Sequence, residues 1–538
     1  MKKILLNFGI FGLLVSVMTG CHDLDVPVTT SLTPDIFPQN STQFIQASGP
    51  AYTALRGNFS LDYWFMQSLS TDEAILPARG GNWYDNQNYQ MLHYHSWTKD
   101  HGWTNGCWNW LSTTIGATNQ ALSILNLTIP AGTAKQTNLA ELKMVRALSY
   151  YMMMDLYGNV PIDTTYGDFS PHPNLPRADV FKFIEKEVKE ALPYLSRASG
   201  ITTYGRANKY TAFALLAKMY VNAEYYTGTQ RNNDCIAACD SVINSGLYSL
   251  EPRSSYLQMF YPNNGPQMKE FIFAIPYDPA ATSAYGLNGF MYHARYDVPR
   301  SATKKFGLPF TPSAPESTLP EFYANFNDPN DIRNKQWLTG LLFMNDGVTP
   351  VTVTTTKKGY DQTYTGSDGS ATYTYQVNLT PDIVLRQDAT AFDCGNDEIA
   401  WNMGYRNIKF YPDNTSTNRN QNNDVPVFRY SDIILMKAEA ILRGGSPTMG
   451  HTALSLTNLL RSNRTTSPSL TTLSLDDLYQ ERNREFASET WHRNDMIRFG
   501  KYEGSWGFKK DSNPNRRIFP IPTSALTVNS ALKQNLGY

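Results

Sequence analysis

Apolar residues recur every three or four positions along much of this chain, which is the spacing of one face of an α-helix. The clearest run joins Leu139 to Leu156 and stops at Gly158, with Pro161 beyond it. Glycine accepts the left-handed backbone that follows a last helical turn, and proline cannot continue a helix. The pattern therefore predicts a helix that ends just before Gly158.

Similar stripes predict further helices, several of them neighbours joined by short links. They cover residues 181–195, 212–223, 235–242, 432–443, 451–461 and 475–488. Ser474 is a candidate N-cap for the last, with Asp476 and Asp477 in its first turn, where carboxylates complement the helix dipole. Helix pairs of this size match a tetratricopeptide-type unit of about 34 residues. We expect a mainly α fold, a tetratricopeptide-like helical-repeat scaffold that carries long loop-rich insertions near residues 60–110 and 250–425.

A different periodicity appears inside the second insertion. Thr, Val and Tyr alternate in VTPVTVTTTKKGY (348–360) and again in SATYTYQV (370–377), on either side of a Gly-Ser-Asp-Gly stretch (366–369). Period-two alternation on both sides of a glycine-bearing turn predicts a small β-hairpin.

The N-terminus has the pattern of an export signal. Two lysines precede an apolar run over residues 4–18, and a glycine and Cys21 follow it. The run is too short for a membrane-spanning helix, so we expect residues 1–20 to be a signal peptide. Cys21 resembles the acylated cysteine of a bacterial lipobox, and Asp23 and Asp25 resemble the acidic surface-export tag of lipoproteins. The alternative is plain secretion, with Cys21 an incidental thiol.

Composition narrows the function classes. The net charge is -1, which gives no electrostatic reason to expect nucleic acid as a partner. Aromatic residues reach 13%, against 17% charged residues, and exposed aromatic rings would suit sugar faces. Cys235 and Cys239 stand four apart on a predicted helix, and we expect them to be buried packing residues rather than a disulfide.

Six sequence blocks carry a family resemblance. They include the turn LYGNVP, the helix start GRANK and the closing QNLGY, and together they cover 140–162, 205–223, 239–250, 422–442, 481–502 and 518–538. In this order they resemble the SusD/RagB family of outer-membrane glycan-binding lipoproteins.

The resemblance implies one SusD-like domain over residues 21–538, with four tetratricopeptide-like repeats. It also implies a noncatalytic protein that captures a glycan ligand outside the cell. Its partner would be a SusC-like TonB-dependent β-barrel transporter, and its location the outer membrane, held by a lipid on Cys21 and facing outward.

The stretch 70–103 combines rings with carboxylate, amide and guanidinium groups, a mixture that suits pyranose faces and vicinal hydroxyls. By the resemblance, the ligand-binding residues include Asp72, Arg79, Trp97 and Asp100. The polar and aromatic composition of the stretch adds Asn82 and Trp83. The alternative is that Trp83 and Trp97 anchor loops to the scaffold while Asp72 and Arg79 pair with each other.

A second wall of the site is expected from the middle insertion. Tyr285, Tyr292 and Tyr296 lie in SAYGLNGFMYHARYDVP, where the family uses aromatic residues. Core packing is the alternative for these three rings.

Charged residues between 481 and 498 could suggest acid–base chemistry, but their spacing favours ion pairs on neighbouring helical turns. Arg429, Asp432 and Glu439 are expected to act in the same way. The predicted pairs are Glu481–Arg484, Arg482–Glu485 and Glu489–Arg493.

No motif supports a cofactor or a metal, so we expect none. His93 and His95 would share one face of a strand, with His101 nearby, yet hydrogen-bonded structural histidines are the favoured interpretation. A structural calcium has loop carboxylates of suitable type in Asp278, Asp413 and Asp424, but no motif of fixed spacing.

Two rival functions remain open. A glycoside hydrolase would need two carboxylates on opposite sides of the scissile bond, for which Asp72, Glu73 and Asp85 are the available residues. A binding lipoprotein of the RagB type would take peptide cargo instead, and a long groove with an exposed strand edge would favour it.

Overall fold

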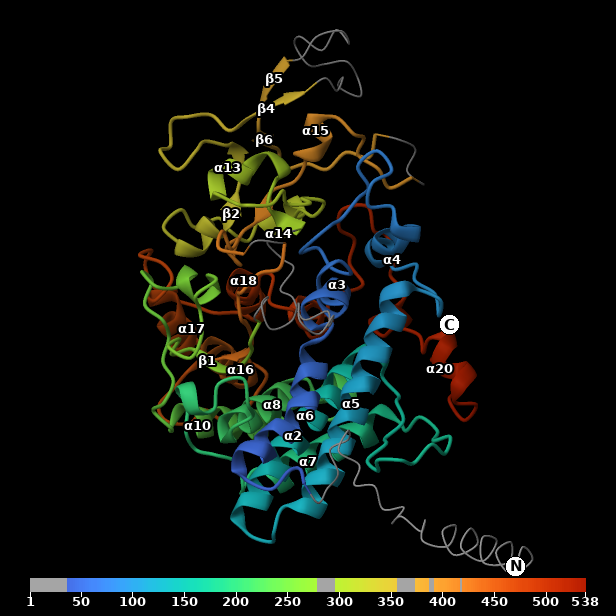
Figure 1. Cartoon of the computed structure of the whole chain (residues 1–538). Coiled ribbons are helices and arrows are strands. Elements are labelled where there is room, and N and C mark those ends of the chain that lie inside the picture. The colour runs from blue at the N-terminus through green and yellow to red at the C-terminus, as the bar shows by residue number, and fades with distance from the viewer. Residues whose placement is uncertain (1–35, 278–295, 356–372, 387–390, 417–418) are drawn as a thin grey trace, which may run out of the picture.

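The computed structural model describes residues 36–277, 296–355, 373–386, 391–416 and 419–538. Long helices fill the lower part of the molecule, and short strands, short helices and loops form the upper part (Figure 1). The long helices are α2 (Ser41–Arg56), α5 (Gly102–Thr128), α6 (Thr133–Tyr157), α7 (Arg177–Ala191), α8 (Lys209–Val221), α10 (Asn232–Ile243), α16 (Tyr430–Leu442), α17 (Ala453–Ser462) and α18 (Leu475–Phe486).

Shorter elements connect and cover this scaffold. The short helices are α3 (Trp64–Ser68), α4 (Asn88–Tyr94), α9 (Ala223–Thr227), α13 (Thr303–Phe306), α14 (Pro320–Tyr323), α15 (Glu398–Trp401), α19 (His492–Arg498) and α20 (Thr523–Val528). The strands are β1 (Phe271–Ile275), β2 (Trp337–Leu338), β3 (Gly340–Leu341), β4 (Thr352–Thr355), β5 (Tyr373–Gln376), β6 (Asn378–Leu379), β7 (Arg406–Asn407) and β8 (Val425–Arg429).

The helices pack in consecutive pairs, as the repeat pattern predicts. Helix α5 packs on α6, α6 on α7, α8 on α10 and α16 on α17. Helix α6 ends at Tyr157, and Gly158 follows with a φ of 71°. Ser474 caps α18, because its side chain accepts the backbone N–H of Asp477 at 3.1 Å while Asp477 returns a bond to the backbone N–H of Ser474. One predicted stripe runs too far, since α7 ends at Ala191 and Leu195 lies beyond it.

Each strand has a single antiparallel partner within the described residues. Strand β1 pairs with β8, which joins the two ends of the second insertion at the scaffold. Strand β4 pairs with β5 through Val353 and Tyr375, so the hairpin is confirmed; its turn lies outside the described residues.

One large apolar core runs through α2, α5, α6, α7, α8 and α10 and reaches the β1–β8 ribbon. Cys107, Cys235 and Cys239 lie in this core as free thiols. Cys394 is a free thiol in a smaller apolar cluster. The predicted packing role of Cys235 and Cys239 is confirmed, and a disulfide between them is excluded. Among the described residues no helix is both long enough and apolar enough to cross a bilayer.

The charged block near the C-terminus is a buried ion-pair network, but most of its partners come from distant elements. Glu485 binds Arg333 at 3.2 Å, Arg429 at 2.9 Å and Arg464 at 3.0 Å. All four side chains are at most 1% exposed. Buried guanidinium groups need carboxylates whatever their position in the sequence.

Two of the three predicted pairs are therefore wrong. Only Glu481–Arg484 forms, at 2.7 Å. Arg482 binds Asp432 and Asp495, Glu489 binds Lys409 and Arg429, and Arg493 binds Asp155. Glu439 binds Arg443 and Arg498, which confirms the expected structural role of Arg429, Asp432 and Glu439.

Candidate functional site

A loop between residues 79 and 87 is clamped by a carboxylate from the second insertion. The Oδ1 atom of Asp393 accepts the backbone N–H of Gly80 at 2.8 Å, and Oδ2 accepts that of Gly81 at 2.7 Å. The N–H of Gly395 completes the set at 2.7 Å, and Ala78 forms a parallel bridge with Asp393. In Figure 1 the blue chain before α4 rises to meet the orange segment that leads to α15.

Gly80 makes this close approach possible. Its φ is 62°, and a Cβ atom placed there would lie 2.3 Å from Cβ of Asn396. Any other residue would both strain the backbone and collide with that side chain. The loop and the 393–396 segment therefore fit together only with glycine at position 80.

The loop backbone is strained at several bulkier residues. Trp83, Asp85, Asn86 and Gln87 all have left-handed φ values, of 67°, 39°, 54° and 65°. Each such residue costs on the order of 1–3 kcal/mol and persists only where the surrounding structure holds it. A tryptophan in this conformation is rare, and strain of this kind concentrates where a site requires a fixed geometry.

The Trp83 ring is partly buried against the core and partly exposed. It meets Tyr296 edge-to-face at 5.4 Å between ring centroids and Tyr89 at 6.5 Å. Tyr296 is itself 7% exposed and packs on Phe65. Trp83 is half-buried and Tyr84 is 45% exposed, so aromatic surface faces solvent at this loop.

Exposed polar groups come from this loop and from the segments of the second insertion linked to it through Asn396 and Trp401. Asn82, Asp85 and Asn86 are exposed on the loop itself. From the second insertion, exposed Asn396 accepts the Nε1–H of Trp401 at 3.1 Å, and exposed Arg300 stacks 4.6 Å above the Trp401 ring. We call the following set the Trp83 rim: Asn82, Trp83, Tyr84, Asp85, Asn86, Arg300 and Asn396.

A buried charged layer lies beneath the rim. Arg79 is fully buried and donates Nη1–H to the carbonyl of Pro77 at 3.2 Å, while its Nε and Nη2 have no hydrogen-bond partner among the described residues. Burial and the nearby Arg79 lower the pKa of Arg406 to about 9. Burial raises the pKa of Asp297 well above its usual range, and burial together with Asp297 does the same for Glu316.

Of the expected ligand residues, Asn82, Trp83 and Tyr296 lie together, with Arg79 buried beneath them. Trp97, Asp72 and Asp100 lie in other surroundings. Trp97 is 1% exposed, packs 4.4 Å from Phe519 and donates Nε1–H to the Tyr538 hydroxyl at 2.7 Å. Its ring has no free face for a sugar in this structure, which matches the alternative that it anchors a loop.

Asp72 and Asp100 also have protein partners. Asp72 is bound to Nε2 of His492 at 2.5 Å, not to Arg79. Asp100 is exposed and accepts the Thr523 hydroxyl at 2.5 Å, at the start of α20. Tyr285 and Tyr292 lie outside the described residues.

The three histidines are structural. His93 lies in α4 and His95 caps its C-terminus, so the strand prediction for this pair is wrong. His93 accepts the Phe508 N–H at 3.1 Å, and His95 binds the Ser70 carbonyl at 2.9 Å. His101 is the N-cap of α5. Burial lowers the pKa of His93 to about 3 and that of His101 to about 4, so both are neutral at pH 7.

Two of the three carboxylates that a hydrolase would use are held by protein partners. Glu73 is fully buried, accepts bonds from the Ser68 hydroxyl and the Ser488 N–H, and has its pKa raised by burial. Asp72 is held by His492, and Asp85 is exposed on the rim. Among the described residues no group of three or more His, Cys, Asp or Glu side chains could hold a metal ion.

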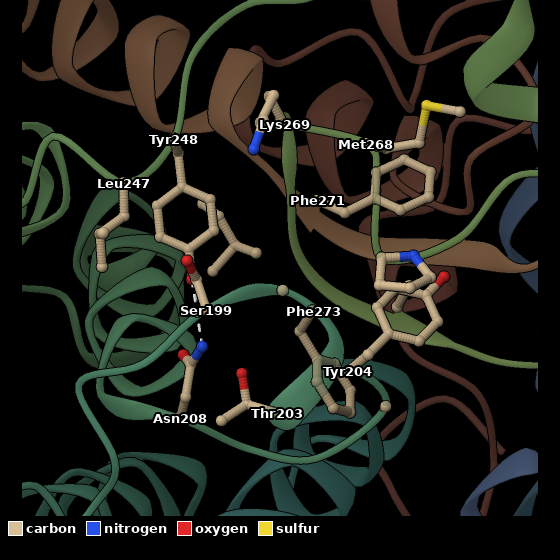
Figure 2. Close-up of a pocket in the computed structure, with 15 residues that line it drawn as sticks. Ser199, Thr203, Tyr204, Asn208, Leu247, Tyr248, Met268, Lys269, Phe271 and Phe273 are labelled. Atoms are coloured by element: carbon tan, nitrogen blue, oxygen red, sulfur yellow. Dashed lines mark hydrogen bonds between the residues drawn. The ribbon is translucent and has the colours of Figure 1, made fainter.

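A small cavity elsewhere is lined by aromatic rings but is too small for this role. Figure 2 shows Tyr204, Tyr248, Phe271 and Phe273 around it, with a hydrogen bond of 3.1 Å between Asn208 and Tyr248. Its volume is about 110 Å³. Sites for small organic ligands run from roughly 300 to 1,000 Å³.

Sequence reasoning missed the residues that the second insertion contributes to the clamp and to the rim. Asp393, Asn396 and Arg300 lie more than two hundred positions from Trp83 in a loop-rich region without a motif. Only the glycine pair at 80 and 81 gives a local signal, since two adjacent glycines indicate that another backbone or side chain approaches closely.

Two protein-family models match the chain. A family model described as the SusD family matches residues 214–538. A second, described as starch-binding associating with outer membrane, matches residues 52–221.

Individual relatives match over nearly the whole chain. The starch-binding protein SusD of Bacteroides thetaiotaomicron is 24% identical, covering 100% of this chain and 99% of its own. Among solved structures, a laminarin binding SusD-like protein has a TM-score of 0.70 at 22% identity, covering 93% of this chain and 100% of its own. Surface glycan-binding protein A from Bacteroides thetaiotaomicron, in complex with laminarihexaose, has a TM-score of 0.69 at 18% identity, covering 92% and 99%.

Proposed function

The chain belongs to the SusD family, and on this premise we propose that it is a noncatalytic protein that binds a glycan at the cell surface through the Trp83 rim. Relatives named for binding starch and laminarin, and one in complex with laminarihexaose, support a glycan ligand. The observation that carries the site assignment is the left-handed Trp83 in the loop held by the Asp393 clamp, where its neighbours Asn82, Tyr84 and Asp85 are exposed.

The chemistry of the rim suits a sugar. The open part of Trp83 and the exposed Tyr84 offer aromatic surface for C–H groups. The Arg300 guanidinium can bind adjacent hydroxyls in pairs. Asn82 donates Nδ2–H to the Arg79 carbonyl at 3.0 Å, and its exposed amide oxygen can accept a further hydrogen bond. The clamp fixes the loop that carries Asn82, Trp83 and Tyr84 before binding, so less conformational entropy is lost when the ligand arrives.

A binding role fits better than hydrolysis. Asp72 and Glu73 are occupied by protein partners, which leaves Asp85 as the exposed carboxylate of the three hydrolase residues. One exposed carboxylate cannot supply both the acid and the base or nucleophile that glycoside cleavage needs.

We place the protein at the outer membrane, held by a lipid on Cys21, where it would pass its glycan to a SusC-like TonB-dependent barrel. The family description of outer-membrane association supports the location. Weak single-site binding would serve delivery, because several contacts along one polymer raise the effective concentration while each contact still releases its cargo.

Affinity electrophoresis of the purified protein against plant, microbial and host glycans tests the proposal. We expect retardation by one glycan, its loss in Trp83→Ala and a reduction in Arg300→Ala. Tyr194→Ala is the matched control, since Tyr194 is an exposed tyrosine, 42% accessible, near the end of α7 and away from the rim. Prolonged incubation should leave the bound glycan uncleaved.

Three results would contradict the proposal. Retardation that survives in Trp83→Ala would move the site elsewhere, and released oligosaccharides would indicate an enzyme. Binding of casein-type peptides, with no retardation by any glycan, would indicate peptide cargo of the RagB type.

A further inference from the structure

A second pocket, unrelated to the Trp83 rim, is lined by arginines. It measures about 380 Å³, within the size range of small-ligand sites. Glu224 is the one carboxylate residue among those that line it, where Gln230 binds its Oε2 at 3.0 Å. The lining arginines come from five separate parts of the chain: Arg177, Arg231, Arg443, Arg498 and Arg517.

Two of these arginines are fully used by the protein. Arg498 donates to Glu439 through Nε at 2.7 Å and Nη2 at 3.0 Å, and its Nη1 binds Asn222 and Asn494. The guanidinium of Arg231 lies between Glu185 and Asp234. These two side chains form a fixed wall of the pocket.

Arg177 differs because it has no carboxylate partner among the described residues. It stands at the first position of α7, and its guanidinium lies 4.2 Å from the Tyr225 ring centroid. Its Nη2 donates to the Tyr225 carbonyl at 2.6 Å. Within the described part of the chain, no hydrogen bond uses its Nε or Nη1, although stacking on Tyr225 holds the group in place.

Arg443 and Arg517 also have unused donors. Arg443 uses Nε on Glu439 and Nη2 on the carbonyl of Arg498. Arg517 uses Nε on Glu503. Among the described residues, Nη1 of Arg443 and both Nη atoms of Arg517 have no acceptor. Three half-buried guanidinium groups therefore bring unused N–H donors to one pocket.

The Tyr225 hydroxyl adds an independent observation. Its oxygen is buried and has no hydrogen-bond partner in the described part of the chain. Tyr225 lines the same pocket and carries the stacked Arg177. Buried polar groups almost always have a partner, so this hydroxyl is a further polar atom behind the pocket wall that the described residues leave unmatched.

We propose that this pocket binds the carboxylate or sulfate group of an acidic sugar unit. Guanidinium groups match the planar geometry of carboxylates and bind sulfate oxygens in pairs, whereas a neutral hydroxyl would leave most of these donors unmatched. That the acid belongs to a sugar rests on the proposed function; that the site takes an anion rests on the arginines alone. A second subsite would let one acidic polymer contact the protein twice and so bind more tightly.

Isothermal titration tests this in the Trp83→Ala background, so that binding at the rim does not contribute. The probes are trigalacturonate, the neutral galactotriose and inorganic sulfate, each at low and at 300 mM salt. We expect trigalacturonate to bind, the neutral trisaccharide not to bind, and affinity to fall with salt. Arg177→Gln/Arg517→Gln should weaken trigalacturonate binding at least tenfold.

Arg197→Gln is the matched control, because Arg197 is an exposed arginine outside the pocket and should leave binding unchanged. Circular dichroism and melting temperature should show that all variants are folded.

The anion site would be overturned by absence of trigalacturonate binding, by equal binding in the double arginine variant, or by equal binding of galactotriose. Sulfate binding as tight as trigalacturonate would overturn the sugar assignment and leave a free-anion site. Affinity electrophoresis of Trp83→Ala with a neutral glycan tests the rim alone, and titration with trigalacturonate in that background tests the arginine pocket alone. A failure of one proposal can therefore be told from a failure of the other.

Discussion

Asp393 accepts the backbone N–H of Gly80 at 2.8 Å, although 313 residues of chain separate the two. The bond joins the first insertion to the second at the base of the loop that presents Trp83. The Asp393 carboxylate accepts three backbone N–H groups that would otherwise need backbone carbonyl partners, as in a short strand pair.

Asp393→Ala should loosen this loop and weaken binding at the rim. Removal of the buried acceptor leaves the amides of Gly80, Gly81 and Gly395 without it, which should cost about 1–3 kcal/mol of unfolding free energy. We expect glycan affinity to fall about tenfold, measured by affinity electrophoresis beside urea denaturation.

Asp346→Ala is the control for that substitution. Asp346 also accepts backbone N–H bonds, from Val348 and Thr349, but in an exposed turn of its own. It should leave glycan binding unchanged. Full affinity in Asp393→Ala would show that the clamp does not position the rim.

Trp97→Ala and Trp83→Ala should separate stability from binding. Trp97 is a core residue, so its truncation should lower the unfolding free energy by about 3–5 kcal/mol. Trp83 is half-buried, and its truncation should chiefly lower glycan affinity. Denaturation and binding assays on both variants check this. A stable Trp97→Ala protein that has lost binding would instead make Trp97 a ligand residue.

Glu485→Gln should be strongly destabilising. The change leaves Arg333, Arg429 and Arg464 with one fewer buried carboxylate, and breaking a buried ion pair costs about 3–5 kcal/mol. Guanidinium denaturation measures the loss. Glu190→Gln, at an exposed pair with Lys143, should cost less than about 1 kcal/mol. Similar losses in the two variants would contradict the network's role.

His101→Asn should reduce the loss of stability in acid. Burial lowers the pKa of His101 to about 4 in the folded chain, from about 6.5 when unfolded. The unfolded chain therefore takes up a proton first as the pH falls, so stability present above pH 6.5 is lost between pH 6.5 and 4. Protonation would also remove the Nδ1 acceptor that caps α5.

Asparagine keeps a side-chain cap but does not titrate. Between pH 7.0 and 4.5 the native sequence should lose on the order of 2 kcal/mol more than His101→Asn. Urea unfolding at the two pH values measures this. Parallel losses would mean that His101 stays neutral, or titrates normally, in both states.

Cys21→Ala should release the protein from the membrane fraction, because the expected lipid would have no attachment atom. Immunoblotting of soluble and membrane fractions measures the distribution. Cys235→Ala, at a buried thiol of α10, is the control and should stay in the membrane fraction. Membrane association of Cys21→Ala would contradict the lipidation prediction.

Elements with local signals could be predicted from the sequence. Gly158 ends α6, Ser474 caps α18, and the alternating Thr and Tyr residues form the β4–β5 pair. These features depend on hydrogen bonds and side-chain periodicity within a few residues, so a short window of sequence contains the cause.

Which side chains meet depends on how the whole chain folds. Trp83 and Trp97 look alike in sequence, yet one opens to solvent at the rim and the other is covered by Phe519 and Tyr538. Glu485 could have paired within its helix but binds three arginines from elsewhere, and Asp393 reaches Gly80 across the chain. Burial and long-range pairing depend on how the insertions pack on the scaffold, because the free energy of a buried ring or charge is set by all its neighbours in space and not by its neighbours in sequence.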